Sequence, residues 1–187
     1  LVTEQCLLDK LDLGAIFAKV QSRILTLDDL LPLPAGQISH CLAVDENTPG
    51  FILYTSGSTG KPKGALHQHG NLAATARQFA AQVLQPDDDA RFYSSSRLFF
   101  AYGLGNSLTF PLYFGCTSVL SATRLSPVET LALVQQQQIT HLFSIPAIYA
   151  ALKPLLAQQP LAASVRMCIS AGEPLSPRLA QDWVHNT

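Results

Sequence analysis

Short runs of β-branched and aromatic residues alternate with helical segments along most of this chain, and this alternation constrains the fold more than any other feature. The expected strands cover residues 51–56, 91–94, 116–121, 140–145 and 166–170, and the expected helices cover 71–85, part of 98–115, 127–138, 146–156 and the residues after Ser176. Repeated strand–helix alternation is typical of a layered α/β structure with a largely parallel sheet.

Local signals predict where individual elements begin and end. Ser126, Pro127 and Glu129 form a capping-box pattern with proline at the first helical position. Asn71 has a good N-cap side chain, and the segment after it ends at Pro86. The run at 51–56 is expected to be a buried strand that leads into a glycine-rich loop.

The first 50 residues carry weaker signals. A helix is possible near residues 11–25, and a Pro- and Gly-bearing stretch follows it. We therefore treat 1–50 as a lead-in segment and 51–187 as the α/β core. The chain begins at Leu1 with a mildly acidic sequence, which indicates a cut N-terminus and no signal peptide.

Composition excludes several classes of protein. Only 13% of residues are charged, against about 25% in an average soluble domain, which indicates a piece of something larger. The net charge is −1 and no basic run is present, so nucleic acid is not expected as a partner. No run approaches the roughly 18 apolar residues needed to cross a bilayer, so no membrane partner is expected.

The four cysteines are 35, 75 and 52 positions apart, which gives neither a CxxC pair nor a dense disulfide framework. A reducing compartment fits this spacing best, and we expect a cytoplasmic protein. The histidines show no spacing typical of metal ligands, so no metal-ligating residue is predicted.

The segment YTSGSTGKPKG at 54–64 combines glycines, hydroxyl side chains and two lysines. Glycines let backbone N–H groups close on an anion, hydroxyls donate to phosphate oxygens, and lysines offset phosphate charge. Composition alone leaves a polar surface turn about equally plausible. A P-loop is excluded, because Gly60-Lys61 is followed by Pro62, which has no hydroxyl for a metal ion.

Two later segments are less specific. FFAYGLGNS at 99–107 places aromatic rings beside glycines, which can form a flat-walled slot, although such runs more often belong to a core. ISAGEP at 169–174 follows a strand and leads to a helix, where a ligand can meet the carboxyl edge of a sheet. Taken alone, it reads as an ordinary connecting loop.

These three segments together resemble the adenylate-forming superfamily of acyl- and aryl-CoA ligases, adenylation domains and luciferase-type enzymes. His69 and Asn71 also fall where such proteins commonly have His-x-Asn, and FFAYGLGNSLTFPL is similar to the acyl-pocket motif of benzoate- and 4-hydroxybenzoate-CoA ligases. The resemblance spans 54–174 and implies part of the N-terminal domain of such an enzyme.

The resemblance implies three groups of site residues, with Lys61 at a variable position. The phosphate-binding group is Thr55, Ser56, Gly57, Ser58, Thr59, Gly60 and Lys63; the adenine group is Ala171, Gly172, Glu173 and Pro174; the aryl pocket is Phe100, Ala101, Tyr102 and Gly103.

The implied reaction activates an aromatic carboxylate with ATP and Mg²⁺ to an acyl-adenylate, and then transfers the acyl group to CoA. Family members are roughly three times as long, and their metal-binding Glu, ribose-binding Asp and catalytic Lys would follow residue 187. We therefore expect no complete catalytic set here and an inactive fragment. The alternatives are an enzyme that loads carrier-protein phosphopantetheine and a non-catalytic nucleotide-binding module.

Overall fold

The computed structural model describes residues 2–3, 25–26, 42–55 and 60–187. They belong to two compact units, Leu1–Ala43 and Val44–Thr187. In the first unit, β1 (Val2–Thr3) pairs in parallel with β2 (Leu25–Thr26). The helix expected near 11–25 lies outside the described residues except for Leu25, which is in β2. The division into a lead-in at 1–50 and a core at 51–187 stays a prediction.

The second unit begins with an antiparallel hairpin of β3 (Pro49–Thr55) and β4 (Lys63–Gln68). The strand expected at 51–56 is present, but the prediction that it is buried is wrong. Ile52 is 54% exposed and Tyr54 is 74% exposed, because within the described part of the chain β3 pairs only with β4 and lies outside the larger sheet. The sequence analysis also missed β4, whose residues KGALHQ contain no β-branched side chain.

The helix after the hairpin begins one residue earlier than expected. It starts as α4 (Gly70–Thr75), with His69 rather than Asn71 at the N-cap position. The N-cap prediction for Asn71 is wrong, because backbone bonds to residues 46–48 fix the start: Gly70 N–H donates to the Glu46 carbonyl at 2.8 Å. Asn71 instead accepts a hydrogen bond from the Gln68 N–H at 2.8 Å.

Four parallel strands form the central sheet, in the order β6-β5-β7-β8. The strands are β5 (Arg91–Ser94), β6 (Thr117–Val119), β7 (His141–Ser144) and β8 (Met167–Ser170). Each coincides with a strand expected from the sequence, and the prediction of a layered α/β structure with a largely parallel sheet is confirmed.

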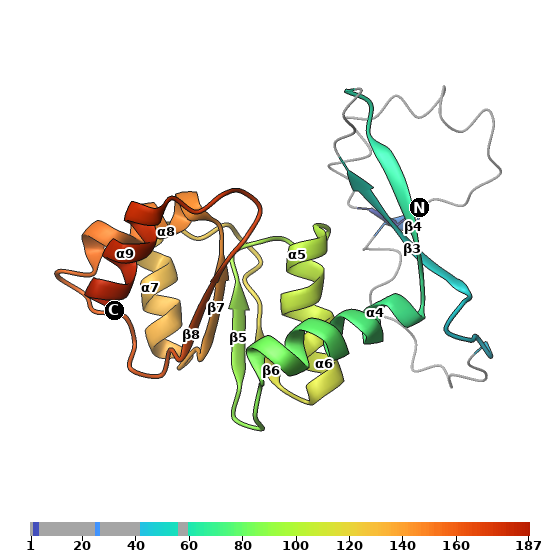
Figure 1. Cartoon of the computed structure of the whole chain (residues 1–187), viewed down its shortest axis with the longest axis horizontal. Helices are drawn as coiled ribbons and strands as arrows, with labels where there is room; N and C mark the ends of the chain where they lie inside the picture. Colours follow the sequence, from blue (N-terminus) through green and yellow to red (C-terminus); the bar gives the residue numbers. More distant parts are fainter. Residues whose placement is uncertain (1, 4–24, 27–41, 56–59) are drawn as a thin grey trace. The chain divides into compact units, whose positions relative to one another are not determined.

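Helices cover both faces of this sheet (Figure 1). One face carries α4 with its π-helical continuation η1 (Ala76–Leu84), and the continuous helix formed by α5 (Ala101–Leu104), π-helical η2 (Gly105–Thr109) and α6 (Phe110–Phe114). The other face carries α7 (Pro127–Gln136), α8 (Pro146–Leu152) with the 3₁₀ turn η3 (Lys153–Leu155), and α9 (Pro177–Asn186).

Alternation along the strands supplies a separate core to each face. Phe92 and Phe143 are fully buried and pack with the helix that contains Phe110. Leu142, one residue from Phe143, points to the opposite face and packs with α7, α8 and α9. Successive side chains point to opposite faces of a strand, so each buried strand needs apolar residues at consecutive positions. These cores fix the sheet between its helix layers.

The expected capping box opens α7. Ser126 Oγ accepts the Glu129 N–H at 3.3 Å, and Glu129 Oε2 accepts the Ser126 N–H at 2.7 Å. The two side chains therefore satisfy backbone donors that an uncapped helix would leave without partners. This contact fixes where the chain turns from the loop after β6 into the helix layer.

Gly103 allows α5 to lie directly on the loop after β5. A Cβ atom at this position would lie 2.1 Å from the Arg97 carbonyl oxygen and 2.7 Å from the Ser96 carbonyl oxygen. Because both obstacles are backbone atoms, a side-chain rotation cannot relieve the overlap. Only glycine permits this close approach.

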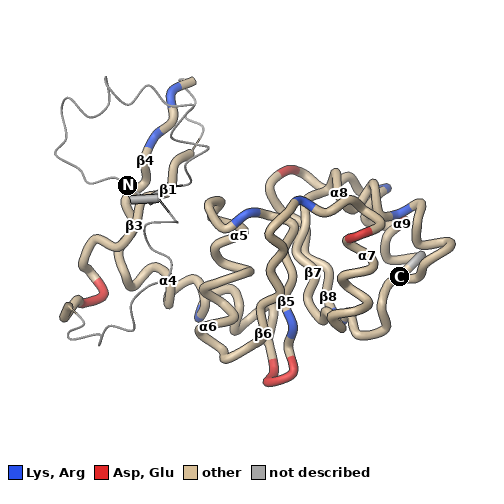
Figure 2. The backbone as a smooth tube through the Cα atoms, turned by 180° about the vertical axis from the view of Figure 1, so that it is seen from behind, with Lys and Arg blue, Asp and Glu red and all other residues tan. Residues whose placement is uncertain are grey.

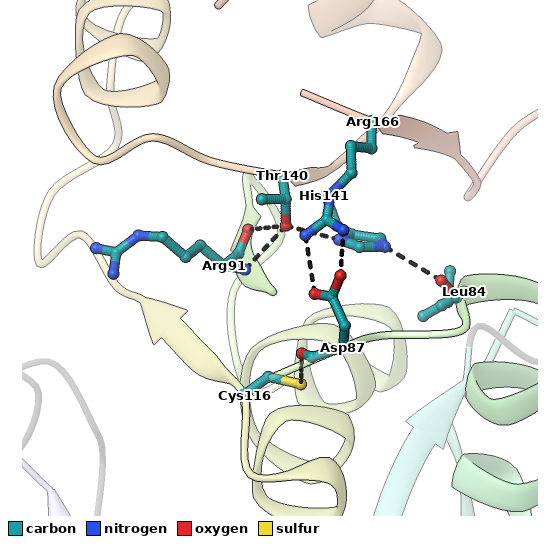
Figure 3. Close-up of polar contacts among 7 residues, drawn as sticks. All are labelled: Leu84, Asp87, Arg91, Cys116, Thr140, His141 and Arg166. Carbon is teal, nitrogen blue, oxygen red and sulfur yellow. Dashed lines mark hydrogen bonds and ion pairs between the residues drawn. The ribbon is translucent and has the colours of Figure 1, made fainter. Parts of the chain in front are cut away.

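A buried histidine joins the amino ends of the strands to η1 (Figure 3). His141 Nε2 lies 3.2 Å from the Leu84 carbonyl oxygen, which can only accept, so Nε2 carries the proton. Its Nδ1 lies 2.8 Å from Thr140 Oγ1 and can accept the hydroxyl proton. Burial lowers the pKa of His141, and the nearby Arg166 charge lowers it further, while the Leu84 contact and Asp87 oppose the shift.

We expect Gly103→Ala to destabilise the chain by about 1–3 kcal/mol, the usual cost of overpacking. Denaturant unfolding followed by circular dichroism measures this loss. Gly105→Ala is the matched control, because its Cβ would meet only the Phe110 ring, at 3.1 Å, and a helical alanine gains up to about 1 kcal/mol. Equal stability of the two variants would contradict the role given to Gly103.

We expect the free energy of unfolding to fall as the pH drops below 6.5, the ordinary pKa of histidine. The lowered pKa means that the unfolded chain binds more protons in this range, so acid favours unfolding. Thermal unfolding at several pH values between 7 and 5 measures this loss of stability. In the His141→Gln variant, stability should depend less on pH over the same range.

Asp87→Asn is the control for this measurement. The hydrogen bond from Arg166 lowers the pKa of Asp87 below its ordinary 3.8, so Asp87 titrates outside the tested range. Asp87→Asn should therefore keep the loss between pH 7 and 5 or deepen it, because the Asp87 charge opposes the lowered pKa of His141. A His141→Gln variant with the same pH dependence as the unchanged chain would refute the assignment.

Candidate functional site

A cavity of about 1090 Å³ lies at the carboxyl ends of the parallel strands. Its walls come mainly from the loops after β5 and β6, with two residues after β7 and one after β8. The lining comprises Tyr93, Ser94, Ser95, Ser96, Arg97, Leu98, Phe99, Phe100, Tyr102, Ser107, Leu120, Ser121, Ala122, Thr123, Arg124, Leu125, Thr130, Ile145, Ile148 and Gly172. Ligands of open α/β sheets bind at this edge.

The topology explains why the sheet is open at this point. β5 and β6 are neighbours, but the helix after β5 packs on one face of the sheet and α7, after β6, packs on the other. The two loops therefore diverge and leave a crevice between them. Arg97 spans it, because its Nη1 donates to the Ala122 carbonyl at 3.1 Å.

Phe100 and Tyr102, two of the residues predicted for the aryl pocket, line the cavity. The Tyr102 hydroxyl donates to the Ile169 carbonyl at 2.9 Å, and burial of the ring raises the pKa of that hydroxyl. The other two residues do not line it: Ala101 is exposed, and Gly103 contacts backbone. The geometry thus brings the two aromatic members of the motif together.

The segment predicted for adenine binding begins where β8 ends. Gly172 lines the same cavity as Tyr102 and has a left-handed φ of +92°, which favours glycine. Ala171 N–H donates to the Ser144 carbonyl and extends the pairing of β7 with β8. Glu173 and Pro174 are exposed and are not among the lining residues. The aromatic and glycine-turn motifs, 70 residues apart, therefore share one cavity.

Tyrosines from both helix layers hold the strand end that precedes this turn. The Tyr149 hydroxyl, from α8, donates to the Ile169 carbonyl at 3.0 Å, and the Tyr102 hydroxyl reaches the same oxygen from the other layer. The sequence analysis missed Tyr149. Tyr149 lies among apolar residues at the start of α8, and nothing in that local sequence indicates a contact with the end of β8.

The segment predicted for phosphate binding connects the two strands of the hairpin. Thr55 and Lys63 are paired across the hairpin, and Gly60 has a left-handed φ of +78°; among the described residues, no atom lies within 4 Å of the place where its Cβ would be. Ser56, Gly57, Ser58 and Thr59 lie outside the described residues. Thr55, Gly60 and Lys63 are exposed and do not line the cavity, so their role in phosphate binding stays a prediction.

Among the residues that the structure describes, Arg97 and Arg124 are the charged side chains that line the cavity, and no acidic side chain lines it. The sequence analysis did not select either arginine as a site residue. Each follows a predicted strand by only a few positions, and that spacing is the signal that could have placed them at the carboxyl edge. The cavity therefore combines aromatic and aliphatic walls, hydroxyl groups and positive charge.

In the part of the chain that the structure describes, no group of three or more His, Cys, Asp or Glu residues is arranged to hold a metal ion. No helix there has the length and apolar character needed to span a membrane.

The chain was compared with known proteins. The AMP-binding enzyme family matches residues 12–186. The anthranilate–CoA ligase of Pseudomonas aeruginosa is 43% identical over 71% of this chain and 25% of its own length. The 4-hydroxybenzoate–CoA/benzoate–CoA ligase of Rhodopseudomonas palustris is 34% identical over 81% of this chain and 30% of its own length.

A benzoate CoA ligase from Burkholderia xenovorans LB400 has a similar solved structure, with a TM-score of 0.79 and 29% identity. The match covers 98% of this chain and 38% of that one. The match thus spans between a quarter and a third of the length of the two ligases from Pseudomonas aeruginosa and Rhodopseudomonas palustris. Because the family match extends over nearly the whole sequence, the chain belongs to the AMP-binding enzyme family.

Proposed function

We propose that this chain is the aryl- and nucleotide-binding part of an acid–thiol ligase that activates a benzoate-type carboxylic acid with ATP and passes it to CoA. The observation that carries the proposal is the cavity lined by both Tyr102 and Gly172. The similarity to ligases named for anthranilate, benzoate and 4-hydroxybenzoate supports an aromatic acid as the substrate.

The chemistry of the cavity suits a planar apolar ring. Phe99, Phe100 and Tyr102 supply aromatic lining, and Leu120 and Ile148 supply aliphatic lining. Aromatic pairs contribute about 0.5–1.5 kcal/mol beyond the burial of their area. We propose that the ring of the acid occupies this space and that its carboxylate points toward the Gly172 turn, where the nucleotide binds.

In the first half-reaction, a carboxylate oxygen forms a bond to the α-phosphorus of ATP, and the bond to the pyrophosphate oxygen breaks. This step joins two anions, so the protein must align them and offset their charge. We propose that Thr55, Ser56, Gly57, Ser58, Thr59, Gly60 and Lys63 bind the phosphates of ATP. We further propose that Ala171, Gly172, Glu173 and Pro174 contact the adenine, and that Ala101 and Gly103 complete the aryl pocket.

In the second half-reaction, a thiolate attacks the acyl carbon and AMP leaves. CoA is the proposed thiol, since the relatives above are named CoA ligases. A carrier-protein phosphopantetheine would undergo the same chemistry. An assay that offers both thiols to the adenylate distinguishes them.

Mg²⁺ is expected with ATP in this superfamily, but the described residues supply no cluster that would hold the ion. The described residues therefore offer no site in which protein side chains alone would hold the ion. The described cysteines, Cys116 and Cys168, are free thiols, which is compatible with the proposed cytoplasmic location.

Grafting tests the proposed function directly. The whole chain replaces the matching segment of the Rhodopseudomonas palustris ligase, and benzoate-dependent ATP–pyrophosphate exchange and thioester formation are measured. We expect both activities in the graft and neither in the chain alone, because the chain covers less than a third of that relative. A folded graft without benzoate-dependent exchange would overturn the proposal. Rapid AMP formation by the chain alone would contradict the expectation that the chain lacks part of the catalytic set.

Lys63→Ala in the same graft should raise the KM for ATP about ten- to hundredfold. A hydrogen bond to a charged group contributes about 1.5–3 kcal/mol, which corresponds to this range. Lys61→Ala is the matched control, because Lys61 is also exposed but occupies a variable position of the motif. If the two variants change the KM equally, Lys63 has no specific role in phosphate binding.

A further inference from the structure

The two arginines of the cavity come from loops on opposite sides of the crevice between β5 and β6. Arg97 belongs to the loop after β5, and Arg124 belongs to the loop after β6. Both arginines are exposed, and both line the cavity. Two guanidinium groups are therefore accessible at a cavity whose other described lining residues are apolar or carry hydroxyl groups.

Their hydrogen-bonding capacity is mostly unused. Arg97 donates one bond, from Nη1 to the Ala122 carbonyl, and a guanidinium has five N–H donors. Arg124 has no hydrogen bond or ion pair to any residue that the structure describes. Arg166, by contrast, forms an ion pair with Asp87 at the other end of the sheet.

The charge of the cavity also differs from that of the chain. The chain as a whole carries −1, with charged residues sparse along the backbone (Figure 2), yet the described residues that line the cavity include two cations and no acid. An apolar wall beside an uncompensated positive charge strengthens the attraction for an anion. Guanidinium donors match the two oxygens of a carboxylate.

We propose that Arg97 and Arg124 form an oxyanion-recognition rim, which selects aromatic acids by their carboxylate over neutral aromatic compounds of the same shape. The ring enters the aromatic cavity, and the rim draws in and orients the carboxylate before it reacts. This inference rests on the proposed function, since it takes the cavity as the site of the acid. The contact of Arg97 with Ala122 positions one side of the rim.

The test is a ligand-observed NMR titration of the full chain with benzoate, with benzamide as the neutral ligand of the same shape, and with inorganic phosphate as a competitor. We expect benzoate to bind about tenfold more tightly than benzamide at low salt, and this preference to shrink as salt is added. Arg97→Gln and Arg124→Gln should each weaken benzoate binding about fivefold and leave benzamide binding unchanged.

Arg77→Gln is the matched control, because it removes the same charge from an exposed position on η1 that does not line the cavity. It should leave the preference for benzoate intact. Circular dichroism checks that each variant is folded, and the salt dependence of the unchanged chain tests the rim without any substitution.

Each alternative result has a distinct meaning. Equal binding of benzoate and benzamide would refute the proposed role of the rim, but it would remain compatible with the cavity as the site of the aromatic ring. Arginine-dependent binding of phosphate without a preference for benzoate overturns the carboxylate assignment. If neither aromatic ligand binds, both the rim and the proposed aryl pocket fail.

Discussion

The rest of the second unit depends on one constraint: β5 pairs in parallel with β6, and the helices that follow these two strands pack on opposite faces of the sheet. Parallel strands cannot be joined by a short turn, so each connection must cross a face of the sheet as a helix. When two neighbouring strands send their connections to different faces, the loops separate. The cavity is the direct result of that separation.

Packing on each face keeps the loops in place. Phe92 and Phe143 are inaccessible to solvent beneath the helix that contains Tyr102, and Gly103 lets this helix approach the backbone after β5. On the opposite face, Tyr149 extends from α8 to the carbonyl at the end of β8. The edge that carries the aromatic ring and the glycine turn is thus supported from both helix layers.

Much of the fold was predictable because its signals are local. The start of α7 is specified by three residues that lie within four positions: Ser126, Pro127 and Glu129. The strands of the central sheet were recognised because short runs rich in β-branched and aromatic residues alternate with helical segments. Burial of β3 was not predictable, since its apolar residues fit equally well a buried strand and the exposed hairpin that forms.

The site was predictable only in part. Phe100, Tyr102 and Gly172 belong to motifs that resemblance identified, and the described structure brings them to one cavity. Arg97, Arg124 and Tyr149 carry no comparable pattern. Their importance arises from where the loops and helices end in space, which neighbouring residues do not encode.

The sequence by itself determined the class of fold, the helix starts at Ser126 and Ser176, and the family to which the chain belongs, because these follow from periodicity and from contiguous motifs. Only the tertiary structure decided which members of those motifs meet, and that two arginines from different loops flank one opening. The reason is physical: a cavity forms where strand ends diverge, and its walls join residues whose separation along the chain conveys nothing about their separation in space.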